Sequence, residues 1–157
     1  MEIQVENIPQ ELKDHPQWVV WKWEKNKSGK ATKPPYNFKT GRRANKTDPK
    51  IWASFHDVVE ALERGYDGVG FCFTEDDPFC GIDLDKCIDP VSGEIESWAL
   101  KIIKDFDSYT EKSPSGTGLK IFSKGKLPGG GIKTEHVELY DRAAYFTVTG
   151  EAYHADS

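Results

Sequence analysis

The sequence predicts an α+β fold in which strands outnumber helices and pair mostly in an antiparallel manner. Short apolar runs are separated by tight turn segments such as residues 75–78 (EDDP), which is typical of strands joined directly. Only residues 92–106 have an extended helical periodicity, so the regular strand–helix alternation of a doubly wound parallel fold is missing. The 157 residues are enough for one core, and we expect residues 1–157 to form a single domain.

Turn and cap residues delimit the elements of the first half of the chain. We expect a short helix near residues 8–14 and a strand at residues 18–23 (WVVWKW). A long loop rich in Lys, Gly and Pro is then expected to continue through Asp48. Ser54 is the predicted cap of a second helix, which is expected to end at Gly65.

The second half contains most of the predicted strands. Residues 69–74 (VGFCFT) and 79–85 (FCGIDLD) are expected to form two strands joined as a hairpin. Residues 92–106 have apolar side chains at helical spacing, so one face of this helix is predicted to lie in the core. Residues 108–126 predict a strand, a Ser/Gly/Pro loop and another strand, and residues 137–150 predict a closing pair of strands.

Composition excludes several classes of protein. No apolar run approaches the ~18 residues of a membrane span, and the N-terminus lacks the pattern of a signal peptide. The three cysteines are odd in number and form no C-x-x-C pair, which favours free thiols in a reducing compartment over disulfides or a zinc knuckle. We therefore expect a cytoplasmic protein without membrane contact.

The net charge of −5 hides a strongly basic segment. Residues 22–46 contain nine Lys or Arg residues and one acid, so this segment carries +8 and the remainder −13. Aromatic residues are interleaved with these cations, a combination that suits a phosphate backbone or a triphosphate. Lys33, Arg42 and Arg43 are the candidate nucleic-acid contacts, and the alternative is a solvated lysine-rich loop.

Two aspartates lie two residues apart in an otherwise apolar strand. Within residues 79–87 (FCGIDLDKC), Asp83 and Asp85 share one face because side chains alternate along a strand. Neighbouring carboxylates repel each other, and burying them is costly unless a divalent cation lies between them. Oxygen-only ligands favour a hard ion such as Mg²⁺ or Mn²⁺ over zinc. The pattern therefore predicts a metal site, and the alternative is a solvent-exposed sheet edge.

Two further segments supply a third acid and a phosphate-binding loop. In residues 137–141 (VELYD), Glu138 is the preferred third acid, with Asp141 behind it because it lies in a turn. The small residues of 113–122 (SPSGTGLKIF) allow the backbone to approach a ligand closely, so that its amides can bind phosphate oxygens, and Lys120 follows on a strand. The segment lacks the Walker A pattern, and an ordinary hairpin turn is the alternative.

Taken in this order, GIDLD, SPSGTGLKIF and VELYD…YFTVTG resemble the archaeo-eukaryotic primase superfamily. The greatest similarity is to the primase-polymerase domain at the N-terminus of phage and plasmid replication proteins. HPQWVVWKW, TKPPYN, TDPKIWASF and GVGFCFT are also similar, so the resemblance covers nearly the whole chain. It implies an RRM-like, mostly antiparallel sheet with flanking helices, a small N-terminal α/β unit, and an active site between them.

The resemblance implies a DNA primase and polymerase, a metal-dependent nucleotidyltransferase that joins nucleotides along a template in phage or plasmid replication. Asp83, Asp85 and Glu138 are then the catalytic acids that hold two Mg²⁺ or Mn²⁺ ions. The residues implied to bind the incoming nucleotide are Ser113, Ser115, Gly116, Gly118 and Lys120. Implied partners are single-stranded or primed DNA, nucleoside triphosphates and a replicative helicase region.

Two positions depart from the superfamily pattern. Lys120 stands where histidine is common, which keeps the positive charge but loses acid–base ability near neutral pH. Ala144 stands where relatives tend to carry an arginine, so one phosphate or template contact is missing or is supplied by Arg142. Relatives usually continue into accessory and helicase regions, so the chain is either a small protein or a domain excised from a longer one.

Two other functions remain open at this point. A non-catalytic module that binds nucleotide or single-stranded nucleic acid can retain the primase fold, and a metal-dependent nuclease uses similar acids without a triphosphate loop. The sequence also leaves open the choice between ribonucleotides and deoxyribonucleotides, primer-independent initiation, and the oligomeric state.

Overall fold

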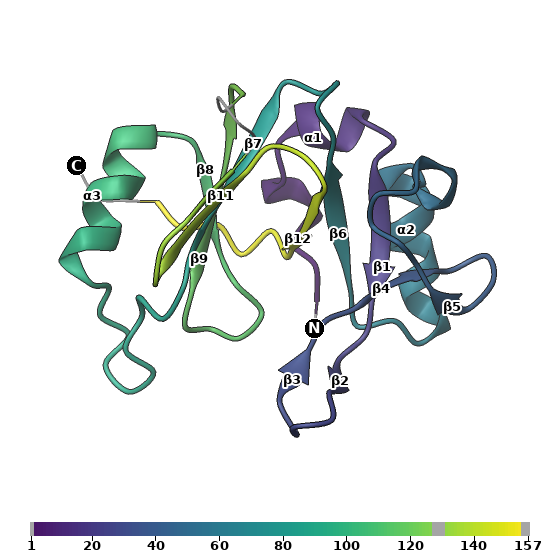
Figure 1. Cartoon of the computed structure of the whole chain (residues 1–157), viewed down its shortest axis with the longest axis horizontal. Coiled ribbons are helices and arrows are strands. Elements are labelled where there is room, and N and C mark those ends of the chain that lie inside the picture. Colours follow the sequence, from purple (N-terminus) through teal and green to yellow (C-terminus); the bar gives the residue numbers. More distant parts are fainter. Residues whose placement is uncertain (1, 127–130, 155–157) are drawn as a thin grey trace.

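The computed structural model describes residues 2–126 and 131–154 and contains two five-stranded antiparallel sheets (Figure 1). The helices are α1 (Gln10–Asp14), α2 (Phe55–Ala61) and α3 (Ser97–Phe106), with short 3₁₀-helices at Val5–Asn7, Pro49–Ile51 and Leu62–Arg64. The strands are β1 (Trp18–Trp21), β2 (Glu24–Lys25), β3 (Ala31–Thr32), β4 (Pro35–Asn37), β5 (Arg42–Arg43), β6 (Gly68–Phe73), β7 (Phe79–Leu84), β8 (Tyr109–Lys112), β9 (Leu119–Lys124), β10 (Gly131–Lys133), β11 (Val137–Tyr140) and β12 (Ala144–Val148). Every strand pair within these described residues is antiparallel, which confirms the α+β class.

The first sheet has the strand order β12-β6-β1-β4-β5. All residues of β1 and β6 are buried, as expected for central strands rich in Val, Phe and Trp. Trp18 pairs with Phe71, which pairs on its other side with Phe146 of β12, and Val20 pairs with Val69. Because paired residues point to the same side, these rows place large apolar groups on one face of the sheet.

The second sheet has the strand order β10-β11-β7-β9-β8, and helix α3 covers one of its faces (Figure 1). Alternate residues of β7 and β9, among them Ile82 and Ile121, pack with Ala99 and Ile103 of this helix. The other face points toward the first sheet. It carries aromatic residues of the shared core and, farther along the strands, the charged residues of the candidate site.

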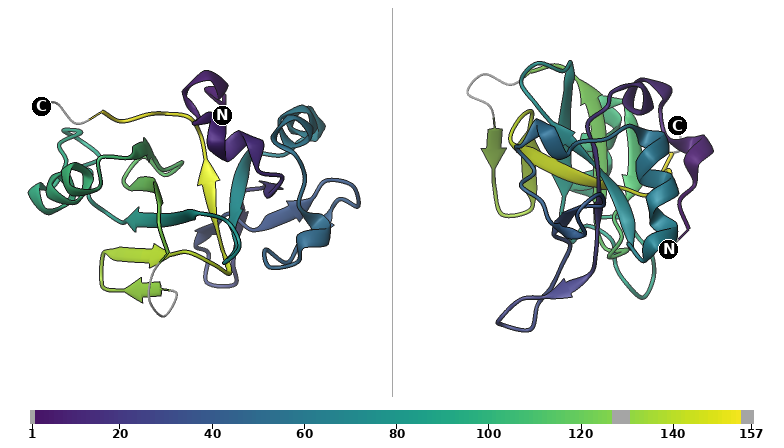
Figure 2. Two further views of the ribbon diagram at one scale, coloured as in Figure 1. Left: turned by 90° about the horizontal axis from the view of Figure 1, so that it is seen from above. Right: turned by 90° about the vertical axis from the view of Figure 1, so that its right-hand side faces the viewer.

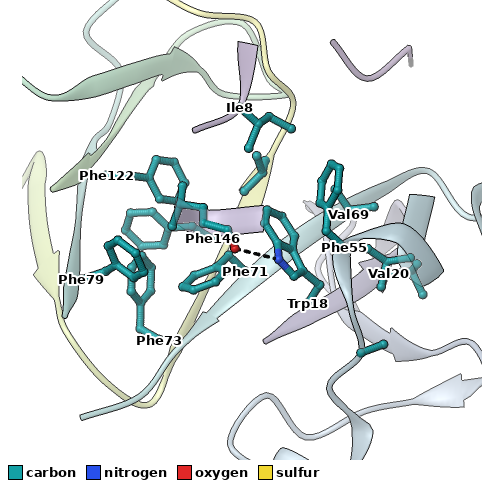
Figure 3. Close-up of a cluster of buried hydrophobic side chains, with 14 of the residues drawn as sticks. Ile8, Trp18, Val20, Phe55, Val69, Phe71, Phe73, Phe79, Phe122 and Phe146 are labelled. Carbon is teal, nitrogen blue, oxygen red and sulfur yellow. Dashed lines mark hydrogen bonds between the residues drawn. The ribbon is translucent and has the colours of Figure 1, made fainter. Parts of the chain in front are cut away.

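One hydrophobic core joins α1, α2 and both sheets (Figure 3). Trp18 is at its centre and meets Phe55 and Phe71 edge-on, with ring centroids 4.8 and 5.3 Å away. Its indole N–H donates to the Leu12 carbonyl at 3.1 Å, so the buried polar group is satisfied. Trp18 thereby fixes α1 and α2 on the same face of the first sheet.

Aromatic rings from both sheets meet where the sheets approach each other. Phe122 of β9 lies 6.1 Å from Phe73 and 5.7 Å from Phe146, measured between ring centroids. Gly81 of β7 allows this approach, because a Cβ atom there would lie 2.6 Å from Phe146 and 2.7 Å from Phe73. The glycine that precedes the two aspartates therefore sets the distance between the sheets at the site.

Both predicted hairpins are wrong, and the two connections are corners that carry the chain between the sheets. β6 belongs to the first sheet and β7 to the second, whereas β11 belongs to the second and β12 to the first (Figure 2). The reason is that β6 pairs with β12 and β1, and β7 pairs with β11 and β9. β6, β7 and β11 are each paired on both sides, so at neither corner can the two adjoining strands pair with each other, and short turns are compatible with both arrangements.

A partly buried lysine, Lys126, ties the two corners together. The Lys126 amine donates to the carbonyl oxygens of Thr74, Phe79 and Asp141 at 2.6, 3.1 and 2.7 Å. It also lies 3.1 Å from the carboxylate of Asp77, whose side chain is fully buried. Asp77 accepts hydrogen bonds from the backbone amides of Thr74 and Phe79 at 2.8 and 2.7 Å. These contacts hold β7 and β11 at a fixed position relative to the first sheet.

The segment that was expected to be a long loop contains four short strands. β4 and β5 extend the first sheet, and β2 and β3 form a separate hairpin that projects from the body (Figures 1 and 2). Asn26 closes the turn of this hairpin, because its side-chain oxygen accepts the backbone N–H groups of Ser28 and Lys30 at 3.0 Å each. Strands of two or three residues are too short for hydrophobic alternation to be detected, which explains the error.

The predicted cap of α2 is confirmed. The Ser54 hydroxyl accepts the N–H of Asp57 at 3.2 Å. After a final 3₁₀ turn the helix ends at Gly65, whose φ is +98°. Helix α3 begins at Ser97, later than the predicted start at Ser92-Gly93. Gly93 has a positive φ of 76°, and Ile95 forms a β-bridge with Ile88, so this stretch is a turn followed by a bridge rather than the first turn of the helix.

Candidate active site

Four charged residues form a row across the second sheet. Asp83 of β7 pairs with Glu138 of β11 on one side and with Lys120 of β9 on the other. Lys120 pairs in turn with Glu111 of β8. Paired residues of antiparallel strands point to the same face with Cβ atoms about 4.5–5.5 Å apart. The register therefore brings together one predicted residue from each of the three motifs.

Asp85 lies at the rim of this row. β7 ends at Leu84, and the Asp85 N–H donates to the His136 carbonyl at 2.8 Å, just before β11 begins. The next residue, Lys86, has a positive φ of 52° and turns the chain away from the sheet. Asp83 is partly buried and Asp85 is exposed, so the two predicted aspartates occupy different depths of one site.

The electrostatics of Asp83 reflect its crowded position. Burial raises the pKa of the Asp83 carboxyl above its ordinary value. The positive charge of Lys120 opposes this shift in pKa, whereas the negative charges of Asp85 and Glu138 add to it. The three acids therefore repel one another when all are ionised, and a cation placed among them would relieve that repulsion.

Glu138 is engaged by two neighbours in this structure. Its carboxylate lies 3.3 Å from the Lys133 amine and accepts the Tyr140 hydroxyl at 2.8 Å. Asp141, the alternative third acid, has a fully buried side chain at the corner after β11, with the Arg142 guanidinium 2.8 Å away. Glu138 is thus in the row with Asp83, whereas Asp141 is part of the connection between the sheets.

The acids fit a hard divalent ion by their chemistry, although they are not drawn together as a closed ligand set. Asp83, Asp85 and Glu138 offer only carboxylate oxygens. Among the described residues, three possible ligand atoms lie within 4.8 Å of one another only at His56, Asp57 and Glu60. Those three are exposed on α2, away from the second sheet. Closing the predicted set requires movement of side chains, including release of Glu138 from Lys133.

Lys120 is held between the two sheets. Its side chain projects from β9, and its amine lies 4.9 Å from the centre of the Phe146 ring of β12. The residue is 8% exposed. No hydrogen bond or ion pair to this amine is found among the described residues, so the charge is balanced through its paired neighbours Asp83 and Glu111. Its charge is available to an anion that enters beside Asp83.

In the Ser/Gly loop between β8 and β9, two of the backbone amides that were expected to bind phosphate oxygens form hydrogen bonds within the loop. The Gly118 N–H donates to the Ser113 hydroxyl at 3.2 Å, and the Gly116 N–H donates to the Ser113 carbonyl at 2.9 Å. Gly118 packs on the end of β7, since a Cβ there would lie 2.9 Å from the Leu84 oxygen. Ser115 is exposed, with its hydroxyl 2.8 Å from that of Ser113. The loop thus offers hydroxyl groups, while these two amides are used internally.

Glu111 is a residue of the site that the sequence analysis missed. It is fully buried, and its carboxylate accepts the Tyr109 hydroxyl at 2.7 Å and the N–H groups of Thr149 and Gly150 at 2.8 and 3.0 Å. Burial raises the pKa of Glu111, while these hydrogen bonds and the charge of Lys120 oppose the shift. An isolated Glu in a predicted strand does not indicate a functional or buried position, because such a residue is usually solvated.

Lys33 is positioned beside the acids by aromatic side chains of the first sheet and its edge. Its amine lies 4.9 Å from the centre of the Trp23 ring, and its carbonyl accepts the Tyr145 hydroxyl. Tyr145 lies directly over Gly70, where a Cβ atom would be 2.6 Å from the ring. Trp23 in turn meets Trp21 edge-on, with ring centroids 5.3 Å apart. These contacts limit where the Lys33 amine can go.

The charge of Lys33 interacts with the candidate site. Burial lowers the pKa of the Lys33 amine, the charge of Lys120 adds to that effect, and Asp83 and Asp85 oppose it. Two lysines, one from each side of the molecule, are therefore close enough to the same aspartates to influence their charge. The sequence pattern did not reveal this electrostatic interaction between the two halves of the chain.

The predicted arginines are placed differently from Lys33. Arg42 and Arg43 are consecutive in β5, so their side chains leave opposite sides of the strand. Arg43 forms an ion pair with Glu24, and Arg42 is exposed. Arg142, considered as a substitute for the arginine absent at position 144, lies 2.8 Å from Glu75 and is bound at the corner.

Comparison with known proteins agrees with the resemblance of the motifs. No helix of the described residues is long and apolar enough to cross a bilayer, and no family model matches the chain. In an alignment of 149 residues that covers 90% of the chain, it is 40% identical to a DNA primase-polymerase of Nitratiruptor phage NrS-1. It spans 20% of the length of that protein. The similarity supports a primase-polymerase family for this chain.

Proposed function

We propose that the chain is the catalytic domain of a template-directed DNA primase and polymerase of phage or plasmid replication. The observation that carries this proposal is the register of β11, β7 and β9, which aligns Glu138, Asp83 and Lys120 in one row. The similarity to a phage primase-polymerase over 90% of the chain supports the same function. Residues 1–157 are then one nucleotidyltransferase domain, acting in the cytoplasm with a helicase region as its partner.

The proposal includes an RRM-like second sheet, as in the archaeo-eukaryotic primases. In chain order β7, α3, β8 and β9 give strand, helix, strand and strand, and β11 returns to pair with β7. This order matches the first four elements and the last strand of a βαββαβ unit. The described residues between β9 and β11 contain β10 in place of a second helix. The first sheet with α1 and α2 then corresponds to the smaller unit.

Asp83, Asp85 and Glu138 are the residues that would hold two Mg²⁺ or Mn²⁺ ions. Their donor set is made only of carboxylate oxygens, and their mutual repulsion contributes to the raised pKa of Asp83. When bound, such ions lower the pKa of an attacking hydroxyl and stabilise a departing pyrophosphate. The protein's part is to fix Asp83 on a buried strand and to offer Lys133 as an alternative partner for Glu138.

We assign the nucleotide to the β8–β9 loop and Lys120, and the template to the basic segment of residues 22–46. Lys120 and the hydroxyl groups of Ser113 and Ser115 would receive the triphosphate, with Gly116 and Gly118 shaping the loop. Charge neutralisation and positioning account for most of the catalytic effect in such a site. The template strand is assigned to the basic segment, for which Lys33, Arg42 and Arg43 are the residues taken from the sequence.

A primer-extension assay tests the proposed function. The chain is expected to add labelled nucleotides to a primed DNA template with Mg²⁺ or Mn²⁺ and to add none in excess chelator. Separate assays with ribonucleotides, deoxyribonucleotides and unprimed template define the substrate. Binding of nucleotide without incorporation would favour a non-catalytic binding module, and shortening of the primer without nucleotide would favour a nuclease.

Lys120→Ala is expected to raise the KM for nucleotide more than it lowers kcat. The reason is that ground state and transition state both carry the triphosphate charge that Lys120 faces. A lost general acid would instead lower kcat by roughly 10²–10³-fold. Steady-state kinetics with varied nucleotide separates the two cases.

Lys120→His supplies the matched control for this position. It restores the residue common in the superfamily and should retain appreciable activity if β9 places position 120 at the triphosphate. If both variants have unchanged kinetics, the segment 113–122 does not bind the nucleotide.

A further inference from the structure

A groove with a basic lining lies beneath the β2–β3 hairpin. Its volume is about 630 Å³, and its walls come from the hairpin, the start of β4, β5, the segment after β5, and Tyr145 of β12. Five of the residues that line it are basic and none is acidic: Lys25, Lys27, Lys33, Arg43 and Lys46. This concentration of positive charge distinguishes it from three other surface hollows, each of which is lined by at least one acid.

The positive charge of the groove is largely uncompensated. Glu24 is the only acid among residues 22–46, and its carboxylate is already bound by Arg43 and by the Tyr36 hydroxyl. Among the described residues, no ion pair is formed by Lys25, Lys27 or Lys46. Repulsion among these lysines is unfavourable for the isolated chain, and a polyanion in the groove would remove it.

The hairpin that carries two of these lysines is ordered by its own hydrogen bonds. The Asn26 side chain binds the turn amides of Ser28 and Lys30, and the Asn26 N–H donates to the Lys30 carbonyl at 2.9 Å. β2 and β3 pair at Glu24–Thr32 and Lys25–Ala31. The lysines are therefore presented on a preformed support, which lowers the entropy lost on binding compared with a flexible loop.

Two residues of the groove wall, Lys33 and Tyr145, connect the groove with the candidate active site. Lys33 lines the groove, and its charge interacts with Asp83 and Asp85. Trp23 and Tyr145 hold this lysine from two sides, as described above. Tyr145 is followed in β12 by Phe146, whose ring centre lies 4.9 Å from the Lys120 amine, and Lys120 pairs with Asp83. A chain of phosphates that follows the lysines as far as Lys33 would therefore approach the charged row.

We infer that this groove binds one strand of DNA through its phosphodiester backbone and guides that strand to Asp83 and Asp85. The inference rests on the proposed function and makes its nucleic-acid site specific. A string of separate cations along a groove suits a repeating phosphate backbone, and single-stranded binding sites combine such grooves with aromatic side chains. Trp23, which is 40% exposed at the root of the hairpin and lies next to the Lys33 amine, offers an aromatic ring to a base at the edge of the groove.

The inference changes which cations of the basic segment contact DNA. Lys25, Lys27 and Lys46 join Lys33, whereas Arg42 does not line the groove. Arg43 lines it but already has Glu24 as a partner. Two triple variants of equal charge can therefore be compared. One is Lys25→Gln, Lys27→Gln, Lys46→Gln in the groove, and the other is Lys39→Gln, Lys50→Gln, Lys104→Gln outside it.

The test measures the affinity of the 157-residue chain for a fluorescent oligothymidylate by anisotropy over a range of salt concentrations. Each phosphate contact on a single strand contributes about 0.7 to the slope of log affinity against log salt. The groove variant should therefore lower the slope by about 2, and the outer variant by less than about 0.5. All six residues are exposed, so thermal melting of both variants should match the parent chain.

Three other outcomes would overturn the inference, each in a distinct way. Equal losses of slope in the two variants would mean diffuse attraction by basic residues throughout the chain. Unchanged slopes in both variants would mean that the lysines of the hairpin are exposed to solvent and do not contact the DNA. A raised KM for nucleotide with unchanged DNA binding would assign the groove to the triphosphate. Groove-dependent DNA binding in a chain that incorporates no nucleotide would sustain this inference while contradicting the proposed function.

Discussion

Asp83→Asn is expected to abolish nucleotide incorporation, with a loss of at least roughly 10³-fold, the scale for removing a group that stabilises transition-state charge. Asp83 is the centre of the charged row, with Glu138 and Lys120 on its two sides. The substitution removes one of three mutually repelling carboxylates without changing side-chain shape. The melting temperature in chelator should therefore be unchanged or higher, so lost activity cannot be attributed to unfolding.

The matched controls use other acids of the same chain. Asp76→Asn, at an exposed turn position, should leave both activity and melting temperature unchanged. Glu138→Ala should be as inactive as Asp83→Asn, whereas Asp141→Ala should lower stability because it removes the buried partner of Arg142. A fully active Asp83→Asn would rule out this metal site. An inactive but stable Asp141→Ala would transfer the third-ligand role from Glu138.

Glu111→Ala is expected to be the most destabilising of these substitutions. It leaves three buried donors without their acceptor, namely the Tyr109 hydroxyl and the amides of Thr149 and Gly150. Each unsatisfied buried group costs about 1–3 kcal/mol, so the free energy of unfolding should fall by about 3 kcal/mol or more. For a chain of this size that corresponds to a decrease of roughly 6–12 °C in melting temperature.

A double-mutant cycle distinguishes this network from a general cost of losing a glutamate. Tyr109→Phe removes one donor and should cost about 1 kcal/mol in the parent chain but much less beside Glu111→Ala. The exposed Glu94→Ala should change the free energy of unfolding by less than about 0.5 kcal/mol. If Glu111→Ala melts like the Glu94 variant, the hydrogen bonds of Glu111 do not support the fold.

The chemistry of the candidate site could be predicted from the sequence to a useful extent. Asp83 and Asp85 stand out because charge is costly in an apolar strand, and the Ser/Gly segment before Lys120 stands out because small residues permit close approach. Local signals of this kind also identified the cap of α2 and the β7 and β9 strands. They require no knowledge of which strands pair.

Pairing itself could not be predicted, and it decides which residues are neighbours. The corners after β6 and β11 have the turn residues of hairpins, but the adjoining strands are paired elsewhere by side-chain packing. Lys33 likewise has no local signal that separates it from the other lysines of its segment. Its position depends on Gly70 leaving room for Tyr145.

The sequence by itself determined the α+β class, the chemical character of three motifs and the concentration of positive charge in residues 22–46, because these depend on residue type and near-neighbour spacing. Only the tertiary structure decided that Glu138, Asp83, Lys120 and Glu111 form one row. It also placed the basic hairpin above a groove that Lys33 lines. The physical reason is that register and sheet packing are set by contacts between segments far apart in the chain, where a shift of one residue moves every side chain to the opposite face.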